Sequence, residues 1–251
     1  MTTGPLGWGL PLYERVAERT GIGPGTSVLD LGCGEGMFCR LATDRGATVT
    51  GIDVAPERIE HARQLAPAAV FRTGDIQALP YPDGVFDVVT SFQSILHVTN
   101  PLAALREAAR VTRPGGRVAV TVWGRDEDCQ VRVFGEALSP LLPPPPPRDR
   151  RIQSPPLTRD GRLEQLAVKA GLTPNEVDEV PCLFVYPDRD ALLSSLLRSR
   201  LGRLAAGRSG EKAVRRAVLE GFAPYRMRDG SYHLRNQFRY LIASAEAARG
   251  P

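Results

Sequence analysis

The segment 28–36 constrains the fold of this chain more than any other, because a short apolar stretch runs straight into three alternate glycines. It reads VLDLGCGEG. The four residues before the first glycine have strand character and include one acid, Asp30. Alternate glycines let a backbone turn sharply and approach a ligand without a Cβ in the way. A predicted helix over Met37 to Arg45 follows, and its first N–H groups are available to an anion.

Two kinds of glycine-rich turn must be distinguished at this position. A dinucleotide-binding turn requires G-x-G-x-x-G, whereas the spacing here is G-x-G-x-G. Counted from Gly32 or from Gly34, the third glycine position of the dinucleotide motif falls on Met37 or on Cys39. The spacing is therefore not that of a nicotinamide-dependent dehydrogenase.

Acidic residues follow the next two predicted strands. Val49 to Ile52 is closed by Asp53, 17 residues after the last of the three glycines, where a carboxylate can accept both hydroxyls of a ribose. Val70 to Thr73 is followed by Asp75 and Ile76. An acid there can accept from the exocyclic amine of an adenine, and an apolar side chain can pack against the ring. These positions predict a nucleoside site.

Two more predicted strands, Val85 to Ser91 and Val118 to Trp123, complete the pattern. In order and spacing, residues 20 to 125 resemble the class I S-adenosylmethionine (SAM)-dependent methyltransferases. The nearest group is methyltransferase type 11, which resembles the ubiquinone- and menaquinone-biosynthesis enzymes and includes many small-molecule methyltransferases. The resemblance implies an α/β, Rossmann-like, seven-stranded, mostly parallel sheet. Its strand order would be 3-2-1-4-5-7-6, with an antiparallel last strand and helices on both faces.

The resemblance also implies which residues bind the cofactor. Asp30 would orient the amino group of SAM, directly or through water, and Asp53 would hold the ribose. The glycines would bring the methionine part and its carboxylate close to the backbone. The predicted cofactor-binding set is Asp30, Gly32, Cys33, Gly34, Gly36, Asp53, Val54, Asp75, Ile76, Ser91 and Phe92.

Two residues after the fourth predicted strand are candidates for catalysis. His97 could act as a general base, since an imidazole suits proton removal at neutral pH. The alternative is a loop histidine that hydrogen-bonds the backbone or packs beneath the cofactor. Gln93 could orient the methyl acceptor, or be an ordinary loop amide. Much of the rate can come from holding the nucleophile in line with the methyl group and excluding water.

The rest of the chain is predicted from periodicity and composition. Periodicity predicts a short amphipathic helix within residues 1–26, and the resemblance implies that this segment is an N-terminal cap and that residues 27–251 form the methyltransferase domain. Insertions at about 124–158 and 188–229 would make a helical lid over the acceptor, with two amphipathic helices between Ala191 and Phe222. Pro143 to Pro147 predicts polyproline II. Strands are also predicted from Glu176 to Tyr186 and from Ser231 to Ala243.

Charge and cysteine content narrow the class of partner. The net charge is +4, and ten basic residues face four acids between Asp188 and Arg228. Without interleaved aromatics, and without an N/D-P-P-Y/F motif after the fourth strand, this excess does not predict nucleic-acid methylation. The cysteines and histidines have no metal-site spacing, so no metal is expected. No run of 18 apolar residues or secretory signal is visible, and a cytoplasmic protein without membrane contact is expected.

The sequence thus predicts a SAM-dependent methyltransferase that acts on an O, N or C atom of a small molecule and releases S-adenosylhomocysteine. A homodimer is one oligomeric state that this prediction allows. Two alternatives stay open. One is an RNA or protein methyltransferase that docks through the Arg-rich region 189–228. The other is a SAM-binding protein that does not transfer the methyl group.

Overall fold

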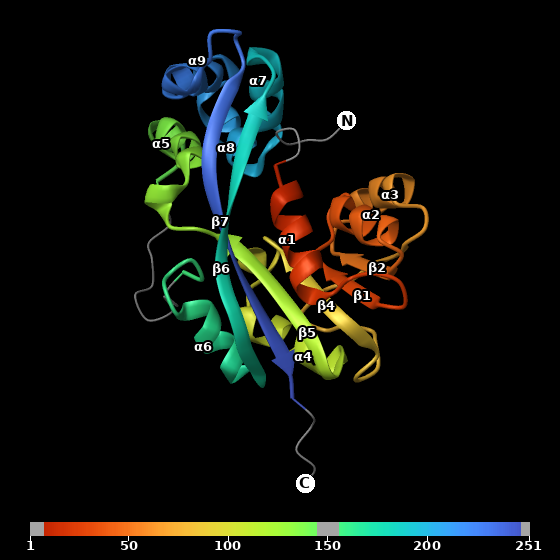
Figure 1. Cartoon of the computed structure of the whole chain (residues 1–251). Helices are drawn as coiled ribbons and strands as arrows, with labels where there is room; N and C mark the ends of the chain where they lie inside the picture. The colour runs from red at the N-terminus through yellow and green to blue at the C-terminus, as the bar shows by residue number, and fades with distance from the viewer. Residues whose placement is uncertain (1–7, 145–155, 247–251) are drawn as a thin grey trace. The chain divides into compact units, whose positions relative to one another are not determined.

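A seven-stranded sheet carries the fold of the chain, whose computed structural model describes residues 8–144 and 156–246 (Figure 1). The strand order is β3-β2-β1-β4-β5-β7-β6. Strands β1 to β5 pair in parallel, and β7 pairs antiparallel with β5. The bounds are β1 Ser27–Leu31, β2 Thr48–Asp53, β3 Val70–Thr73, β4 Phe86–Phe92, β5 Thr112–Trp123, β6 Leu172–Tyr186 and β7 Tyr232–Ala245. The predicted order and the antiparallel last strand are confirmed.

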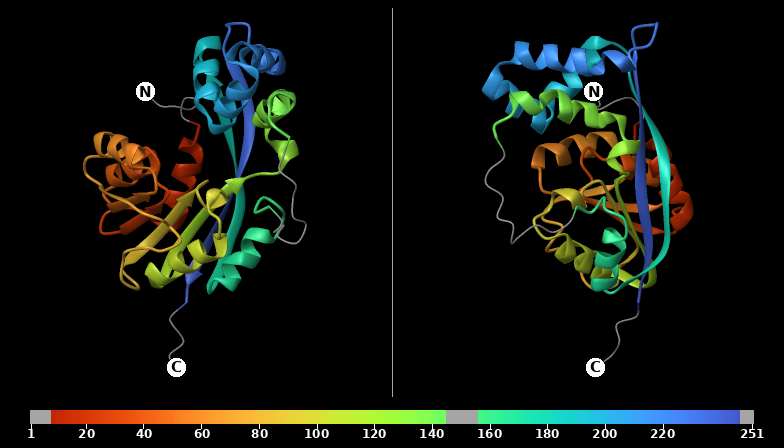
Figure 2. Two further views of the ribbon diagram at one scale, coloured as in Figure 1. Left: turned by 180° about the vertical axis from the view of Figure 1, so that it is seen from behind. Right: turned by 90° about the vertical axis from the view of Figure 1, so that its left-hand side faces the viewer.

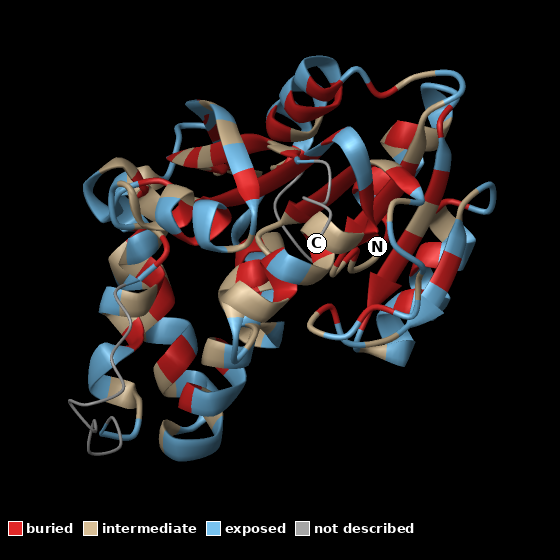
Figure 3. Cartoon of the chain, turned by 90° about the horizontal axis from the view of Figure 1, so that it is seen from below, coloured by how far each residue is buried: buried red, intermediate tan, exposed pale blue. Residues whose placement is uncertain are grey.

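Helices cover both faces of this sheet, as two views of the ribbon show (Figure 2). They are α1 Leu10–Thr20, α2 Met37–Asp44, α3 Pro56–Leu65, α4 Pro101–Val111 and α6 Arg162–Lys169. Because successive strand residues point to opposite faces, Val28 packs with α1, α2 and α3, whereas Leu29 packs with α4 and α6. Strands buried on both faces read as continuous apolar runs, and the central strands are buried here (Figure 3).

The region predicted as two helices between Ala191 and Phe222 contains three. They are α7 Arg189–Arg198, α8 Arg200–Ser209 and α9 Glu211–Phe222. Ser199 separates the first two, because its side chain accepts from the Gly202 N–H and caps α8. Gly210, at φ 81°, ends α8. The prediction of two helices was wrong because the apolar stripe from Leu192 to Leu204 continues across Ser199, where α7 ends and α8 begins.

Other element bounds differ modestly from the prediction. β5 begins at Thr112 and β6 at Leu172, both earlier than expected. The first insertion contains a short helix that was not predicted, α5 Val133–Leu138. The predicted polyproline segment Pro143 to Pro147 lies mostly outside the described residues.

The described residues cluster into two compact units. One falls within Leu12–Trp123, Pro155–Val180 and Phe238–Pro251, and the other within Met1–Pro11, Gly124–Ser154 and Pro181–Gln237. All predicted cofactor residues belong to the first, here called the cofactor unit. We call the second the helical unit, since it holds α5 and α7 to α9. Within residues 8–144 and 156–246, no helix is long and apolar enough to cross a membrane.

Candidate functional site

The three alternate glycines form a turn between β1 and α2, and each has a positive φ. A Cβ on Gly32 would lie 2.3 Å from Ser94 Cβ, and one on Gly36 would lie 3.0 Å from Ala62 Cβ. A Cβ on Gly34 would meet no atom within 4 Å. The outer two glycines are therefore required by the protein's own packing, whereas the middle one faces open space. That space can receive a ligand close to the backbone.

The turn is tied to β2 by hydrogen bonds. The N–H groups of Gly32 and Cys33 both donate to Ile52 O, at 2.7 and 3.0 Å. Helix α2 starts directly after the turn, and its N-cap residue, Gly36, has no side chain to cap it. The first N–H groups of α2 are thus oriented to bind an anion such as a carboxylate.

Asp53 joins the glycine turn to the end of β2. Its Oδ2 accepts from the Gly34 N–H at 2.9 Å, and its Oδ1 accepts from the Ala55 N–H at 2.9 Å. The residue is only 5% exposed. Each carboxylate oxygen keeps a second lone pair. The carboxylate can therefore accept two hydroxyl groups of a ribose without giving up its contacts with the turn, and the ribose role predicted for Asp53 fits this geometry.

Asp30 lies beneath the turn and is 2% exposed. Thr90 Oγ1 donates to its Oδ1 at 2.8 Å, and Cys39 Sγ donates to its Oδ2 at 3.6 Å. Burial raises the pKa of Asp30 from an ordinary 3.8 to about 7; the two hydrogen bonds oppose the rise, and the nearby Asp53 adds to it. A direct contact of this buried carboxyl with the amino group of SAM stays a prediction.

This buried acid makes stability depend on pH. Between about pH 4 and pH 7 the folded chain keeps a proton on Asp30 that the unfolded chain has lost. The free energy of unfolding should therefore fall as pH rises through this window, by up to ~4 kcal/mol, and this contribution should be constant above it. The variant D30N should lose most of that slope. Urea denaturation at several pH values measures it, and an equal slope in both proteins would contradict the assignment.

The loop after β3 carries Asp75 and Ile76, which differ from each other in exposure. Asp75 is exposed, and its Oδ1 accepts from the Gln77 N–H at 2.8 Å. Ile76 is 6% exposed and packs in the core on the α4 side of the sheet. Gln77 also accepts from Thr99 Oγ1 and from the Asn100 N–H, at 3.0 and 2.9 Å. Gln77 thereby ties the loop that carries Asp75 to the residues just before α4.

Arg110 of α4 holds the other end of the same loop. It donates to Leu79 O and Tyr81 O and forms ion pairs with Glu107 and Asp83. Glu107 in turn accepts from the Leu79 N–H at 2.7 Å. Neither Gln77 nor Arg110 was predicted, because nothing in a single sequence marks a positioning contact across about 30 residues.

The end of β4 and the residues that follow it lie against the glycine turn. Ser91 and Ser94 share a hydrogen bond of 2.6 Å, and Ser94 donates to Leu31 O at 2.5 Å. Phe92 is partly buried between two aromatic rings, with ring centroids 4.7 Å from Tyr13 of α1 and 4.3 Å from Phe38 of α2. Val54, another predicted cofactor residue, is 73% exposed.

The two catalytic candidates lie in this segment. Gln93 has φ 56° and donates through its N–H and its Nε2 to Thr121 Oγ1, both at 3.1 Å. His97 ends a short 3-10 turn, η1 Ile95–His97, and is exposed. Within the described residues, its backbone N–H donates to Ser94 O, and its imidazole forms no hydrogen bond.

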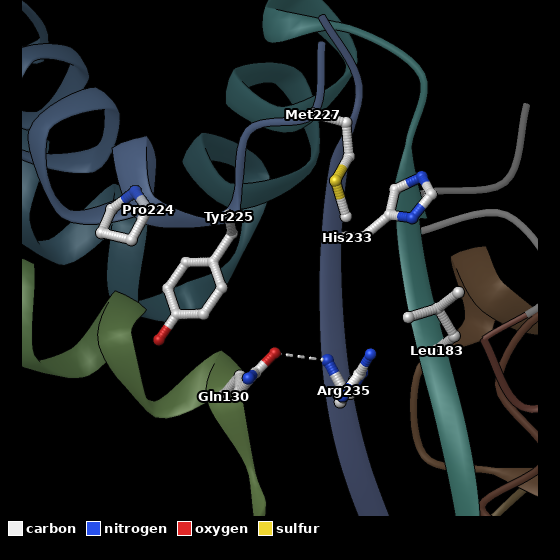
Figure 4. A pocket seen from close by; sticks show the side chains of 7 residues that line it. All are labelled: Gln130, Leu183, Pro224, Tyr225, Met227, His233 and Arg235. Atoms are coloured by element: carbon white, nitrogen blue, oxygen red, sulfur yellow. Dashed lines mark hydrogen bonds between the residues drawn. The ribbon is translucent and has the colours of Figure 1, made fainter. Parts of the chain in front are cut away.

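The helical unit contains a cavity of about 290 Å³ that was not predicted (Figure 4). Its lining residues are Gln130, Leu183, Pro224, Tyr225, Met227, His233 and Arg235. Gln130 Oε1 accepts from the Arg235 N–H at 2.7 Å. None of these residues belongs to the predicted cofactor set. In the described part of the chain, no cluster of three His, Cys, Asp or Glu side chains could hold a metal.

The cofactor unit thus presents an anion-binding helix start, an open glycine and a buried carboxylate at the carboxyl ends of neighbouring parallel strands. This is where open α/β sheets bind their ligands, at the point where strand order reverses beside β1. The donors and acceptors fit the carboxylate and ribose of SAM. SAM supplies an electrophilic methyl group on a sulfonium. The residues described here would bind and orient it.

Comparison with known proteins agrees with this geometry. A family model described as "Methyltransferase domain" matches residues 29–120. The 2-methyl-6-phytyl-1,4-hydroquinone methyltransferase of Synechocystis sp. is 43% identical over 112 residues, which is 43% of this chain and 35% of that protein. The 27-O-demethylrifamycin SV methyltransferase of Amycolatopsis mediterranei is 40% identical over 43% of each chain. The chain therefore matches less than half the length of these two relatives.

A third relative matches almost end to end. The malonyl-[acyl-carrier protein] O-methyltransferase of Serratia marcescens is 32% identical over 94% of this chain and 89% of that protein. Among solved structures, the [4+2]-cyclase SpnF has 26% identity and a TM-score of 0.60, over 94% of this chain and 81% of that one. A putative methyltransferase from Bacillus halodurans shares the fold, with a TM-score of 0.63 at 15% identity, over 94% and 99%. With its sheet order, its glycine turn and this end-to-end relative, the chain belongs to the class I SAM-dependent methyltransferases.

Proposed function

We propose that this protein transfers the methyl group of SAM to a small-molecule acceptor. The observation that carries the proposal is the bridge made by Asp53, which ties the open Gly34 to the end of β2 and leaves two lone pairs for a ribose. Asp75 and Ile76 would frame the adenine, and the start of α2 would bind the carboxylate. Holding SAM rigidly in this way leaves its methyl group free to meet a nucleophile in line.

The relatives narrow the class of acceptor. Their names describe a hydroquinone, a rifamycin and a malonyl group on a carrier protein. The first two support a small organic acceptor. We propose that the insertion helices help to select it, as the expected acceptor lid. A cytoplasmic location and a homodimer stay predictions.

The test separates cofactor binding from transfer. Calorimetry should detect SAM binding, and NAD should not bind. Radiolabelled methyl transfer should then be measured on a panel containing a hydroquinone, a primary amine, a thiol and a dicarboxylic acid. Binding of SAM together with incorporation into at least one member would support the proposal. Absence of SAM binding would contradict it.

His97 is proposed as the general base of this reaction. Its side chain is exposed, so an acceptor can reach it, and no side-chain hydrogen bond or ion pair within the described residues would be lost on substitution. The variant H97Q should therefore keep its melting temperature and its SAM affinity. Transfer to a protonated hydroxyl should slow by roughly 10²–10⁴-fold. The loss should be partly recovered at high pH with a phenol, because the phenolate forms unaided. A variant that loses stability and SAM affinity together would instead indicate a scaffold role.

A second function is favoured by one comparison. The structure at 26% identity is that of a [4+2]-cyclase, so a protein of this fold carries out a reaction other than methyl transfer. For this chain, tight SAM binding without incorporation into any member of the panel would favour such a role. The RNA alternative has less support, since Arg215 and Arg216 of the Arg-rich region pair with Glu211 and Glu220 on the same helix.

A further inference from the structure

Gln93 has an unusual backbone for its residue type. Its φ of 56° is the only positive value at a non-glycine position in the described ranges 8–144 and 156–246. Glycine adopts this backbone region freely, and asparagine and aspartate adopt it occasionally. Other residues rarely do, because their Cβ crowds the backbone. Such strain persists where the surroundings impose it, and it gathers at functional sites.

The side chain of Gln93 carries a second cost. Its Nε2 and its backbone N–H both donate to Thr121 Oγ1, and Thr121 is fully buried. The remaining polar atom, Oε1, is buried and has no hydrogen-bond partner among the described residues. A buried acceptor without a donor destabilises a fold. Two unfavourable features at one residue indicate a role that folding alone does not explain.

The amide of Gln93 is held on the β5 side of β4. The glycine turn, Asp53 and Asp75 follow β1, β2 and β3, which lie on one side of β4. Both Gln93 donors turn to Thr121 of β5, on the opposite side of β4. The amide is therefore held on the β5 side of β4, next to Phe92 of the predicted cofactor set, which pairs with Thr121, and on the opposite side of β4 from the glycine turn, Asp53 and Asp75.

We propose that Gln93 is a positioning residue for the methyl acceptor, which it orients by accepting a hydrogen bond at Oε1 from the acceptor's nucleophilic O–H or N–H group. This inference rests on the proposed function and names its substrate class, hydroxyl or amine acceptors. A carboxylate at neutral pH has no proton to donate to Oε1, so this contact does not serve it. Holding the proton of the nucleophile aims its lone pair at the methyl carbon.

The reaction itself follows ordinary displacement. The nucleophile's lone pair forms the bond to the methyl carbon as the carbon–sulfur bond breaks, and the sulfonium takes that electron pair and becomes a neutral thioether. The proton of the O–H or N–H group leaves to a base or to water. Gln93 holds this proton in the bound acceptor but does not remove it, since a neutral amide is too weak a base.

Three variants test the proposal. Q93M keeps the length of the side chain but removes both ends of the amide. Q93E keeps an accepting oxygen. Q237M is the matched control, because Gln237 of β7 also has a buried Oε1 without a partner among the described residues and lies outside the predicted cofactor set. SAM affinity, melting temperature, and kcat and KM for hydroquinone, a primary amine and a dicarboxylic acid are measured for each.

The expected results separate the role proposed for Gln93 from the proposed methyl transfer itself. Q93M should bind SAM like the wild type and melt within about 2–4 °C of it, because loss of the Nε2 hydrogen bond to Thr121 is offset by removal of a buried acceptor that has no donor. Its kcat/KM for the hydroxyl or amine acceptor should fall about tenfold to a hundredfold, and Q93E should recover part of that loss. Q237M should leave transfer unchanged.

Four outcomes would overturn the inference. Q93M could lose stability and SAM affinity together, which would make Gln93 a structural residue. Q93M could keep full transfer, or Q93E could be as impaired as Q93M, which would exclude an accepting role for Oε1. Wild type could methylate only the dicarboxylic acid, which would refute the substrate class while leaving the proposed methyl transfer intact. Absence of SAM binding in the wild type would instead refute the proposed function itself.

Discussion

Replacing Asp53 with alanine should weaken SAM binding by at least tenfold. The carboxylate would lose two ribose contacts, and losing hydrogen bonds to a charged acceptor costs about 2–4 kcal/mol. The same substitution frees the N–H groups of Gly34 and Ala55, so the turn that faces the ligand would also lose one of its ties to β2, while the bonds from Gly32 and Cys33 to Ile52 O stay. Both effects weaken the binding of SAM. Calorimetric titration with SAM measures the sum.

The control for Asp53→Ala is Asp44→Ala. Asp44 is an exposed acid at the end of α2 that pairs with Arg40 on the same helix. Its loss should leave SAM affinity unchanged, because surface pairs within one helix contribute little. Equal SAM affinity in wild type and a folded D53A protein would show that Asp53 does not hold the cofactor.

Alanine at Gly34 and alanine at Gly32 should have opposite consequences, although the two glycines are two residues apart. At Gly34 the new Cβ meets nothing within 4 Å, so the free energy of unfolding should fall only by the ~1–2 kcal/mol of a left-handed alanine. SAM affinity should fall far more, by about a hundredfold, because the Cβ occupies the space that the ligand needs. At Gly32 the Cβ would overlap Ser94, and the loss of stability should reach ~2–5 kcal/mol.

Chemical denaturation without ligand and calorimetry with SAM distinguish these two variants. G34A is expected to be a folded protein that fails to bind, and G32A an unstable one. If G34A bound SAM as tightly as the wild type, the cofactor would not approach this part of the turn. If G32A were as stable as the wild type, Ser94 would have to move at little cost, and its hydrogen bond to Leu31 would not matter.

Local sequence patterns predicted the part of the site that depends on single elements. The glycines need their positive φ, the strands are apolar runs, and acids close β2 and follow β3; each is visible within about ten residues. The strand order was available only through the family resemblance. Asp53 was predicted as a ribose ligand, and its contacts with Gly34 and Ala55 fit that role; the contact with the ribose stays a prediction.

Contacts between distant segments were beyond the reach of the sequence. Thr90 and Cys39 surround Asp30 from β4 and α2, and Gln77 links the loop after β3 to α4. Nothing local to these residues indicates such partners. The unsupported oxygen of Gln93 is likewise visible only once β4 and β5 are side by side. The two-helix prediction failed for a different reason, since an apolar stripe gives the face of a helix but not the residue at which it stops.

The place of β7 in the sheet has a consequence for the order in which the chain is made. β7 lies between β5 and β6, yet it is synthesised after both. On the ribosome, β1 to β5 can pair as they emerge, whereas β6 must wait beside an unfilled gap until the last fourteen-residue strand is complete. The part of the sheet from β3 to β5 can thus form during translation, while the pairing of β5 with β7 follows only when Tyr232–Ala245 has left the ribosome. A nascent chain stalled before Tyr232 should therefore expose the edge of β5, and this edge is where a chaperone would bind it.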